Sequence, residues 1–278
     1  MCRVLGVSRQ GYYHYRRNTE ARLADPEHQE MLEWVKDIAI ASNYTYGRRS
    51  MKKAMNVLGF PITRTMTENL MEEAEAQVRH KKKFKVTTNS NHKLPLFENL
   101  LEREFDVEQP NRVFASDITY VWTQEGWLYL AVVMDLYSRR IIGWSMSRRL
   151  SRHLAVNALT MALDQRHPGD DLIHHSDRGV QYMSDDFQEQ LKVNGIICSM
   201  SGKGSCYDNA AVESFFASLK RERTRRRKYR TRDEARADVF DDIERFYNRK
   251  RRHGYVGNIS PVLFEKRTLG LNSGVHQT

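Results

Sequence analysis

The sequence predicts an α/β protein in which a mixed sheet flanked by helices follows a small helical region. Three observations support this fold class. Apolar residues recur at helical spacing near the N-terminus. Runs rich in β-branched and aromatic residues follow one another through the middle of the chain. Beyond them, helical and strand patterns alternate, which is typical of a sheet with helices on its faces.

The composition narrows the class of partner. The chain has 278 residues, with 45 Lys and Arg against 35 Asp and Glu and a net charge of +10. This balance suits a polyanion, either nucleic acid or an anionic membrane surface. There is no apolar run of about 18 residues to span a bilayer and no signal peptide, so we expect a cytoplasmic protein that does not act at a membrane. The three cysteines, Cys2, Cys198 and Cys206, show no CxxC spacing and favour neither a disulfide framework nor a zinc site.

Residues 1–78 are predicted to form a helical N-terminal region. After a basic, tyrosine-rich stretch, Pro26 starts a helix, a second helix ends at Gly59, and Thr63 caps a third. The segment 46–77 therefore has the form of a helix-turn-helix, although a simple helical hairpin fits equally well. Four basic residues slightly favour contact with DNA: Arg48, Arg49, Lys52 and Lys53. Residues 79–110 are predicted to be a basic linker, since they begin with a polar segment that is poor in core residues.

The catalytic core is expected within residues 111–222. Three strand-like runs at 112–122, 126–138 and 139–147 predict an antiparallel meander. A helix at 151–166, a strand at 171–176, a helix at 185–195, a strand at 196–200 and a helix at 207–222 follow. The predicted order is βββαβαβα. Residues 223–278 are predicted to be a basic, helical C-terminal extension.

Three acids occupy positions where a carboxylate is better explained by catalysis or metal binding than by packing. Asp117 interrupts an apolar strand, where an unpaired charge is costly. Asp177 follows a strand at its carboxyl end, where open α/β sheets place functional groups. Glu213 lies on a helix where an apolar face meets a polar stripe that includes Asn209 and Lys220, although a lone glutamate at such a boundary is more often only solvated. Carboxylate oxygens suit Mg²⁺ or Mn²⁺, so the three could form one metal site.

The adjacent His174 and His175 lie beside this region on the predicted strand 171–176. Neighbouring strand residues face opposite sides, so at most one of them could reach a metal at the acids. We expect both to serve packing and hydrogen bonding.

At these residues the sequence resembles a known family. The stretches "DITY", "HSDRGVQY" and "SGKGSCYDNAAVESFFASLK", with residues 178–212 lying between the second and third acids, are similar to signatures of bacterial insertion-sequence transposases whose core is shared with retroviral integrases. The resemblance extends to "MCRVLGVSRQGYYHY" at the start and "YNRKRRHGYVGNISPVLFE" near the end, and so covers almost the whole chain.

This resemblance implies a ribonuclease H-like fold and a metal-dependent transposase of the second-reading-frame type. It implies that Asp117, Asp177 and Glu213 are the catalytic and metal-binding residues, and that two Mg²⁺ or Mn²⁺ ions serve one active site, with Asp117 bridging them. The implied reaction is hydrolysis at a transposon 3′ end, followed by strand transfer by the freed 3′-hydroxyl. The implied partners are transposon-end and target DNA, a first-reading-frame product and further copies of the chain, in the bacterial cytoplasm at the nucleoid.

A basic run leads directly away from the helix that carries Glu213. Residues 220–232 are predicted to continue that helix, and 248–253 form a second basic stretch. A charge run is usually a solvated face, but this position suits contact with DNA phosphates. The predicted DNA-binding residues are Asn209, Lys220, Arg221, Arg223, Arg225, Arg226, Arg227, Lys228, Arg230, Arg251 and Arg252.

Two other functions remain open from sequence. A ribonuclease H-type nuclease would use the same fold and metals, but the basic tail and the signature stretches argue against it. A catalytically silent DNA-binding regulator derived from a transposase would be favoured by loss of an acid. All three acids are present.

Overall fold

The computed structural model describes residues 8–78, 97–102, 105–202 and 209–270. The chain divides into two compact units, one within residues 1–82 and the other within residues 83–278. Each unit has its own apolar core. Within the described residues, no helix is long and apolar enough to cross a membrane.

The N-terminal unit is helical, as predicted. Thr63 caps its last helix, because its hydroxyl accepts a hydrogen bond from the Met66 N–H at 3.2 Å. The buried side chains that hold helices together include Val35, Met51 and Leu70. The helices are α1 (Arg9–Ala24), α2 (Pro26–Ala41), α3 (Arg48–Val57) and α4 (Arg64–Glu73).

The second unit has a five-stranded mixed sheet with the strand order β3-β2-β1-β4-β5. The first three strands form an antiparallel meander, and β4 and β5 add to it in parallel. The predicted order βββαβαβα and the α/β fold class are confirmed. The strands are β1 (Val113–Thr123), β2 (Gly126–Asp135), β3 (Arg140–Ser147), β4 (Ile173–Ser176) and β5 (Ile197–Met200).

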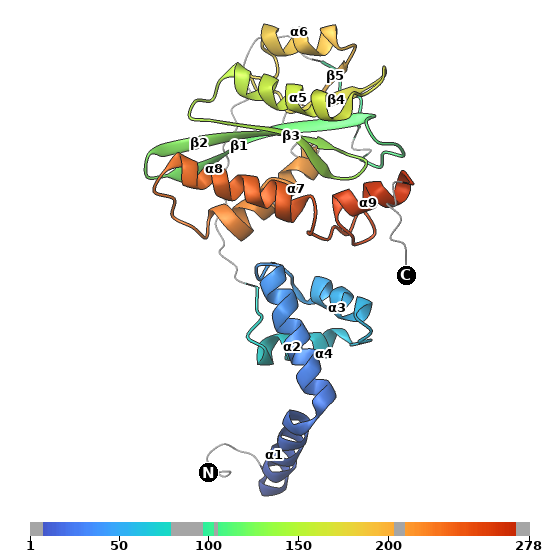
Figure 1. Cartoon of the computed structure of the whole chain (residues 1–278), viewed down its shortest axis with the longest axis vertical. Helices are drawn as coiled ribbons and strands as arrows, with labels where there is room; N and C mark the ends of the chain where they lie inside the picture. Colours follow the sequence, from blue (N-terminus) through green and yellow to red (C-terminus); the bar gives the residue numbers. More distant parts are fainter. Residues whose placement is uncertain (1–7, 79–96, 103–104, 203–208, 271–278) are drawn as a thin grey trace, which may run out of the picture. The chain divides into compact units, whose positions relative to one another are not determined.

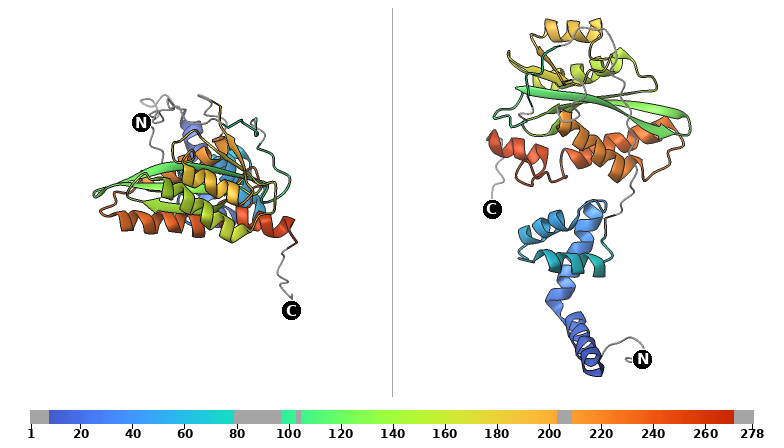
Figure 2. Two further views of the ribbon diagram at one scale, coloured as in Figure 1. Left: turned by 90° about the horizontal axis from the view of Figure 1, so that it is seen from above. Right: turned by 180° about the vertical axis from the view of Figure 1, so that it is seen from behind.

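Helices cover both faces of this sheet, with one apolar core on each side (Figures 1 and 2). On one side, α5 (Arg152–Arg166) and α6 (Asp185–Val193) pack against residues such as Phe114 and Ile142. On the other, α7 (Ala210–Leu219) and α8 (Arg232–Phe240) pack against residues such as Leu130 and Val132. This three-layer arrangement brings α7, with Glu213, beside the central strand β1.

Two expected boundaries differ from the structure. The described end of the predicted linker 79–110 belongs to the second unit, where Leu101 is buried in the sheet core and Phe105 packs against it. Residues 79–96 and 103–104 of that prediction lie outside the described residues. The C-terminal extension is also part of this core, since Tyr229 and Ile243 are buried in it.

The basic run 220–232 is only partly helical. The α7 helix passes into a π-helix, η2 (Lys220–Thr224), and the chain then turns. Tyr229 forms a bridge to Thr123, and its carbonyl accepts a hydrogen bond from the Gln124 N–H at 3.0 Å. The predicted continuous helix is therefore wrong beyond residue 224, because the chain pairs with the β1–β2 hairpin instead. After α8 follow a second π-helix, η3 (Asp241–Tyr247), and α9 (Pro261–Thr268).

Candidate active site

The register of two parallel strands places the first two acids side by side. Ser116 of β1 pairs with Ser176 of β4, and the two strands run in the same direction. Asp117 and Asp177 each follow the last residue of the β1–β4 pairing. Since neighbouring strands lie about 4.8 Å apart, both acids lie at the same edge, where β4 ends and β1 continues.

Local hydrogen bonds orient these two carboxylates. The Ile118 N–H donates to Asp117 Oδ1 at 2.6 Å, and the Gly179 N–H donates to Asp177 Oδ1 at 2.9 Å. A Cβ atom at position 179 would lie 2.9 Å from Asp177 Oδ1, so a larger residue there would crowd the carboxylate. Glycine at 179 thus permits the turn that fixes Asp177.

The third acid is brought to this edge by α7. Glu213 lies in the first turn of the helix and is exposed, whereas Val212 and Phe216 anchor the helix in the core. Asn209, immediately before the helix, donates from Nδ2 to the Ser116 carbonyl at 2.9 Å. This bond connects the beginning of the Glu213 helix to the residue that precedes Asp117.

Burial and the charges of neighbouring acids raise the pKa of Asp117 and of Glu213. Burial raises the pKa of Asp117 well above its usual value, and the charges of Asp177 and Glu213 raise it further, against the Ile118 hydrogen bond and the Lys220 charge. Burial and the Asp177 charge also raise the pKa of Glu213. Carboxylates in this arrangement repel one another, so a bound cation would relieve the repulsion.

The oxygen donor set and the repulsion between its carboxylates fit a hard divalent cation. In the part of the chain that the structure describes, however, no three His, Cys, Asp or Glu side chains form a ready-made ligand group. The three acids are therefore neighbours rather than a closed metal cage.

Two buried histidines next to the acids serve the strands, as expected. His174 Nε2 lies 2.7 Å from Ser116 Oγ, and His175 Nδ1 lies 2.9 Å from Ser199 Oγ. Burial lowers the pKa of His174 to about 3, with a smaller contribution from His175, so His174 is neutral. The prediction that both histidines pack and hydrogen-bond is confirmed.

Tyr182 is a residue of the site that the sequence reading did not single out. Its side chain is 2% exposed, and its hydroxyl has no hydrogen-bond partner among the described residues. Burial and the charges of Asp117 and Asp177 raise its pKa, which places the phenol in the field of both acids. Its place in the quoted stretch "HSDRGVQY" was the signal that could have drawn attention to it.

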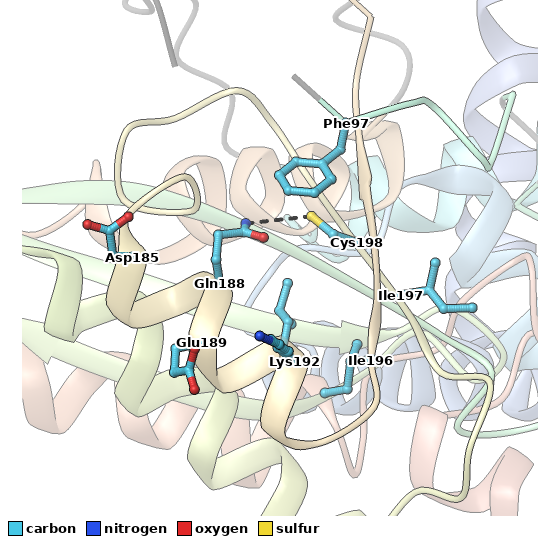
Figure 3. A pocket seen from close by; sticks show the side chains of 9 residues that line it. Phe97, Asp185, Gln188, Glu189, Lys192, Ile196, Ile197 and Cys198 are labelled. Carbon is cyan, nitrogen blue, oxygen red and sulfur yellow. Dashed lines mark hydrogen bonds between the residues drawn. The ribbon is translucent and has the colours of Figure 1, made fainter. Parts of the chain in front are cut away.

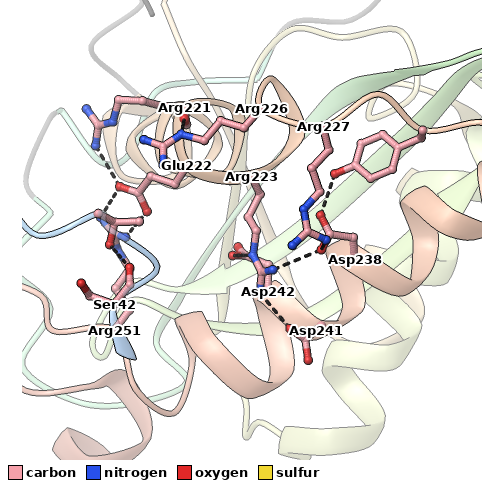
Figure 4. A network of polar contacts seen from close by, with 12 residues as sticks. Ser42, Arg221, Glu222, Arg223, Arg226, Arg227, Asp238, Asp241, Asp242 and Arg251 are labelled. Carbon is pink, nitrogen blue, oxygen red and sulfur yellow. Dashed lines mark hydrogen bonds and ion pairs between the residues drawn. The ribbon is translucent and has the colours of Figure 1, made fainter. Parts of the chain in front are cut away.

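The structure divides the predicted DNA-binding residues into two groups (Figure 4). Arg223 is 8% exposed, and its guanidinium donates to Asp238, Asp241 and Asp242. Three carboxylates thus occupy its hydrogen-bond donors. The expected phosphate contact of Arg223 is corrected to a structural role, because this side chain stabilises the packing of η2 against α8 and η3.

Two further predicted contacts are also structural. Arg251 forms an ion pair with the buried Glu222, and its side chain is 16% exposed. Asn209 is buried and donates to Ser116. The other predicted residues retain surface, from half-buried to well exposed: Lys220, Arg221, Arg225, Arg226, Arg227, Lys228, Arg230 and Arg252.

A separate hollow of about 590 Å³ lies at the outer edge of the sheet, between α6 and β5 (Figure 3). Phe97, Gln188, Ile197 and Cys198 are among the residues that line it, and none of the three acids does. Cys198 lies on β5, as expected, but is only partly buried. Cys2 and Cys206 are outside the described residues.

Comparison with known proteins agrees with this geometry. The model described as Integrase core domain matches residues 107–206, and a second model of the same description matches residues 213–269. Together with the ribonuclease H-like sheet order and the acids at its edge, these matches define a polynucleotidyl transferase with an integrase core.

Relatives over the full length identify the family. The Insertion element IS600 uncharacterized 31 kDa protein of Shigella sonnei is 42% identical, with 96% of this chain and 98% of the relative covered. Transposase InsF for insertion sequence IS3A of Escherichia coli strain K12 is 44% identical, with 97% and 94% covered. The chain belongs to this family of insertion-sequence transposases and is a DNA transposase. A chain of the simian T-cell lymphotropic virus intasome matches 82% of this chain and 72% of its own length, with 15% identity and a TM-score of 0.48.

Proposed function

We propose that Asp117, Asp177 and Glu213 are the catalytic residues of this transposase, acting on the ends of an insertion sequence. The observation that carries the proposal is the shared edge of β1 and β4, where the parallel register sets the two aspartates side by side and Asn209 ties the Glu213 helix to the same point. The mutual effect of the acids on pKa supports their proximity.

The three carboxylates of Asp117, Asp177 and Glu213 would hold Mg²⁺ or Mn²⁺, two ions per site. Bound divalent ions would supply an acidified water and stabilise the leaving oxygen during in-line displacement. The protein would contribute orientation: the Ile118 and Gly179 amides fix one oxygen of each aspartate. No side chain is needed as general base, in agreement with the neutral, locally bonded His174.

The same site would perform two reactions in turn. Hydrolysis would break a phosphodiester at the 3′ end of the element and leave a 3′-hydroxyl. That hydroxyl would then attack another phosphodiester, so that one bond forms as another breaks and no ATP is required. The chain would act with a first-reading-frame product and with further copies of itself, since pairing two DNA ends requires at least two protomers.

DNA phosphates would be bound by the basic side chains that retain surface next to α7. Arg230, for example, has a side chain that is 80% exposed, and its described ion-pair partner is Glu234 in the first turn of α8, whose side chain is 38% exposed. Such exposed pairs are weak and exchange readily for phosphate. The charge of Lys220 lowers the pKa of Asp117, so this side chain lies within electrostatic reach of the acids.

The test is metal-dependent nicking and joining of labelled DNA that carries the element's own ends, with and without the first-frame product. Glu213→Gln keeps the size of the side chain but removes its charge, and should abolish both reactions. Glu189→Gln, on the exposed face of α6, is the matched control and should remain active. Equal activity of Glu213→Gln and the wild type would refute the assignment of Glu213.

A further inference from the structure

An exposed group of aromatic rings lies on the β1–β2 hairpin. Trp122 is 59% exposed and Trp127 is 42% exposed. Their ring centroids are 4.7 Å apart with the ring planes at 70°, and the Tyr120 ring lies 4.9 Å from that of Trp127 at 82°, so the rings meet edge to face. We call Tyr120, Trp122 and Trp127 the aromatic platform.

The platform is unusual because large aromatic side chains are normally mostly buried. A single exposed tryptophan would need no explanation, but two in contact, with a third ring beside them, form a continuous apolar surface. The register places Trp122 opposite Trp127 and Tyr120 opposite Tyr129, so the rings are held by the strands themselves. Rings that the strands hold in place in this way can stack against another planar group.

The platform lies on the same strand as a catalytic acid. Tyr120 and Trp122 follow Asp117 by three and five residues on β1. At about 3.3 Å per strand residue, they lie roughly 10 and 17 Å from it along the strand, and the odd spacings place them on the opposite face of the sheet. Lys220 connects the two, because its Nζ lies over the Tyr120 ring and its charge acts on Asp117. This separation corresponds to a few nucleotides of an extended DNA strand.

Positive charge borders the platform. Lys220 Nζ lies over the Tyr120 ring, 5.1 Å from its centroid. Arg232 donates from Nε to the Trp127 carbonyl at 3.1 Å. It also forms an ion pair at 3.8 Å with Glu125, the acid of the hairpin tip, which offsets that negative charge. Cations beside exposed rings are the combination that binds single-stranded nucleic acid, where phosphates meet cations and bases stack on rings.

We propose that the aromatic platform stacks on unpaired DNA bases next to the phosphodiester that is cleaved. Bases within a duplex have their faces covered by neighbours, so a stacking surface selects a strand that is locally unpaired. The cationic border favours DNA over an apolar protein partner. This inference rests on the proposed function of the acids and adds a preference for an opened DNA end.

The test uses the full chain in EDTA with two probes: a fully paired duplex, and the same duplex ending in an unpaired stretch that contains 2-aminopurine. Stacking on an aromatic ring quenches 2-aminopurine fluorescence. Trp122→Ala should abolish the quenching and weaken binding of the unpaired probe about tenfold, with duplex binding unchanged. Trp122→Tyr, which keeps a ring, should restore both signals.

Phe240→Ala is the matched control, because Phe240 is also an aromatic residue that is 42% exposed, but on α8. It should behave as the wild type. Unchanged quenching and affinity in Trp122→Ala would overturn the proposal, and so would a change in the sedimentation of Trp122→Ala without a change in quenching, which would make the platform a contact between copies. Since EDTA removes divalent ions, Glu213→Gln should still quench, so stacking and cleavage can fail independently.

Discussion

Replacing Arg223 should destabilise the second unit, within residues 83–278, far more than replacing an exposed arginine of the basic run 220–232. Arg223→Met keeps most of the aliphatic volume but removes the charge shared by three aspartates. Asp238 would keep its bonds to Arg227 and Tyr229, and Asp241 is 39% exposed at the side chain. Asp242, whose side chain is only 7% exposed, is therefore the carboxylate that would lose most of its stabilisation.

Removing one partner of a buried ion pair costs about 3–5 kcal/mol. Because one of the three aspartates carries most of the loss, we expect the lower end, about 3 kcal/mol of unfolding free energy. For a unit of this size, the melting temperature should fall by roughly 6 to 12 °C. Arg230→Ala, which removes an exposed ion pair, should cost less than about 0.5 kcal/mol.

The pH dependence of this loss has a definite sign. Burial raises the pKa of Asp242 to about 6, although Arg223 lowers it, so removing Arg223 should raise it further. Protonation at low pH then neutralises the unpaired carboxylate in the variant. The difference in stability between Arg223→Met and the wild type should be largest above the raised pKa of Asp242 in the variant, shrink as the pH falls from there to about 6, and change little below that.

The measurement is thermal unfolding followed by circular dichroism at several pH values, for the wild type, Arg223→Met and Arg230→Ala. A loss below about 1 kcal/mol for Arg223→Met, or equal losses for the two variants, would refute the structural role of Arg223.

Three further outcomes are expected. Asn209→Ala removes the hydrogen bond to the Ser116 carbonyl. It should lower the turnover of end cleavage about tenfold and the free energy of unfolding by about 1 kcal/mol. Unaltered turnover at saturating DNA would contradict the anchoring role of Asn209. Tyr182→Phe removes a buried hydroxyl without a partner among the described residues and should leave thermal stability equal or higher, and a drop of several degrees would reveal a missed hydrogen bond. Gly143→Ala would place Cβ 2.2 Å from the Ala158 carbonyl oxygen. It should therefore lower the free energy of unfolding of the second unit by at least about 2 kcal/mol, measured by urea unfolding. Full stability would show that α5 can move away from β3.

Local patterns were sufficient to predict the order of strands and helices in the catalytic unit. Runs such as 126–138 carry their strand signal in their own composition, and Thr63 carries its capping signal in its own hydroxyl. The acids were identified because each breaks a local pattern. Their convergence could not be derived from such patterns, because it depends on the pairing of Ser116 with Ser176 across the sheet.

The structure departs from the sequence predictions where contacts between residues far apart in the chain determine the fold. The basic run suggested phosphate contacts for Arg223, but the aspartates that bind it lie on α8 and η3, beyond a turn in the chain. Leu101 and Phe105 lie among charged residues without strand or helix periodicity, so nothing in their own segment indicated a place in the core. In the sequence, the three rings of the aromatic platform indicate only two strands.

The two histidines of β4 also bear on how the protein avoids misfolding. Strand β4 has four residues and could in principle pair one position out of step, which would separate Asp177 from Asp117 and reverse the faces of its side chains. In the observed alignment, His174 contacts Ser116 on one neighbouring strand and His175 contacts Ser199 on the other. A slipped strand would bury two imidazoles without these partners, at about 1–3 kcal/mol each. The two hydrogen bonds therefore favour the strand register that places Asp177 beside Asp117.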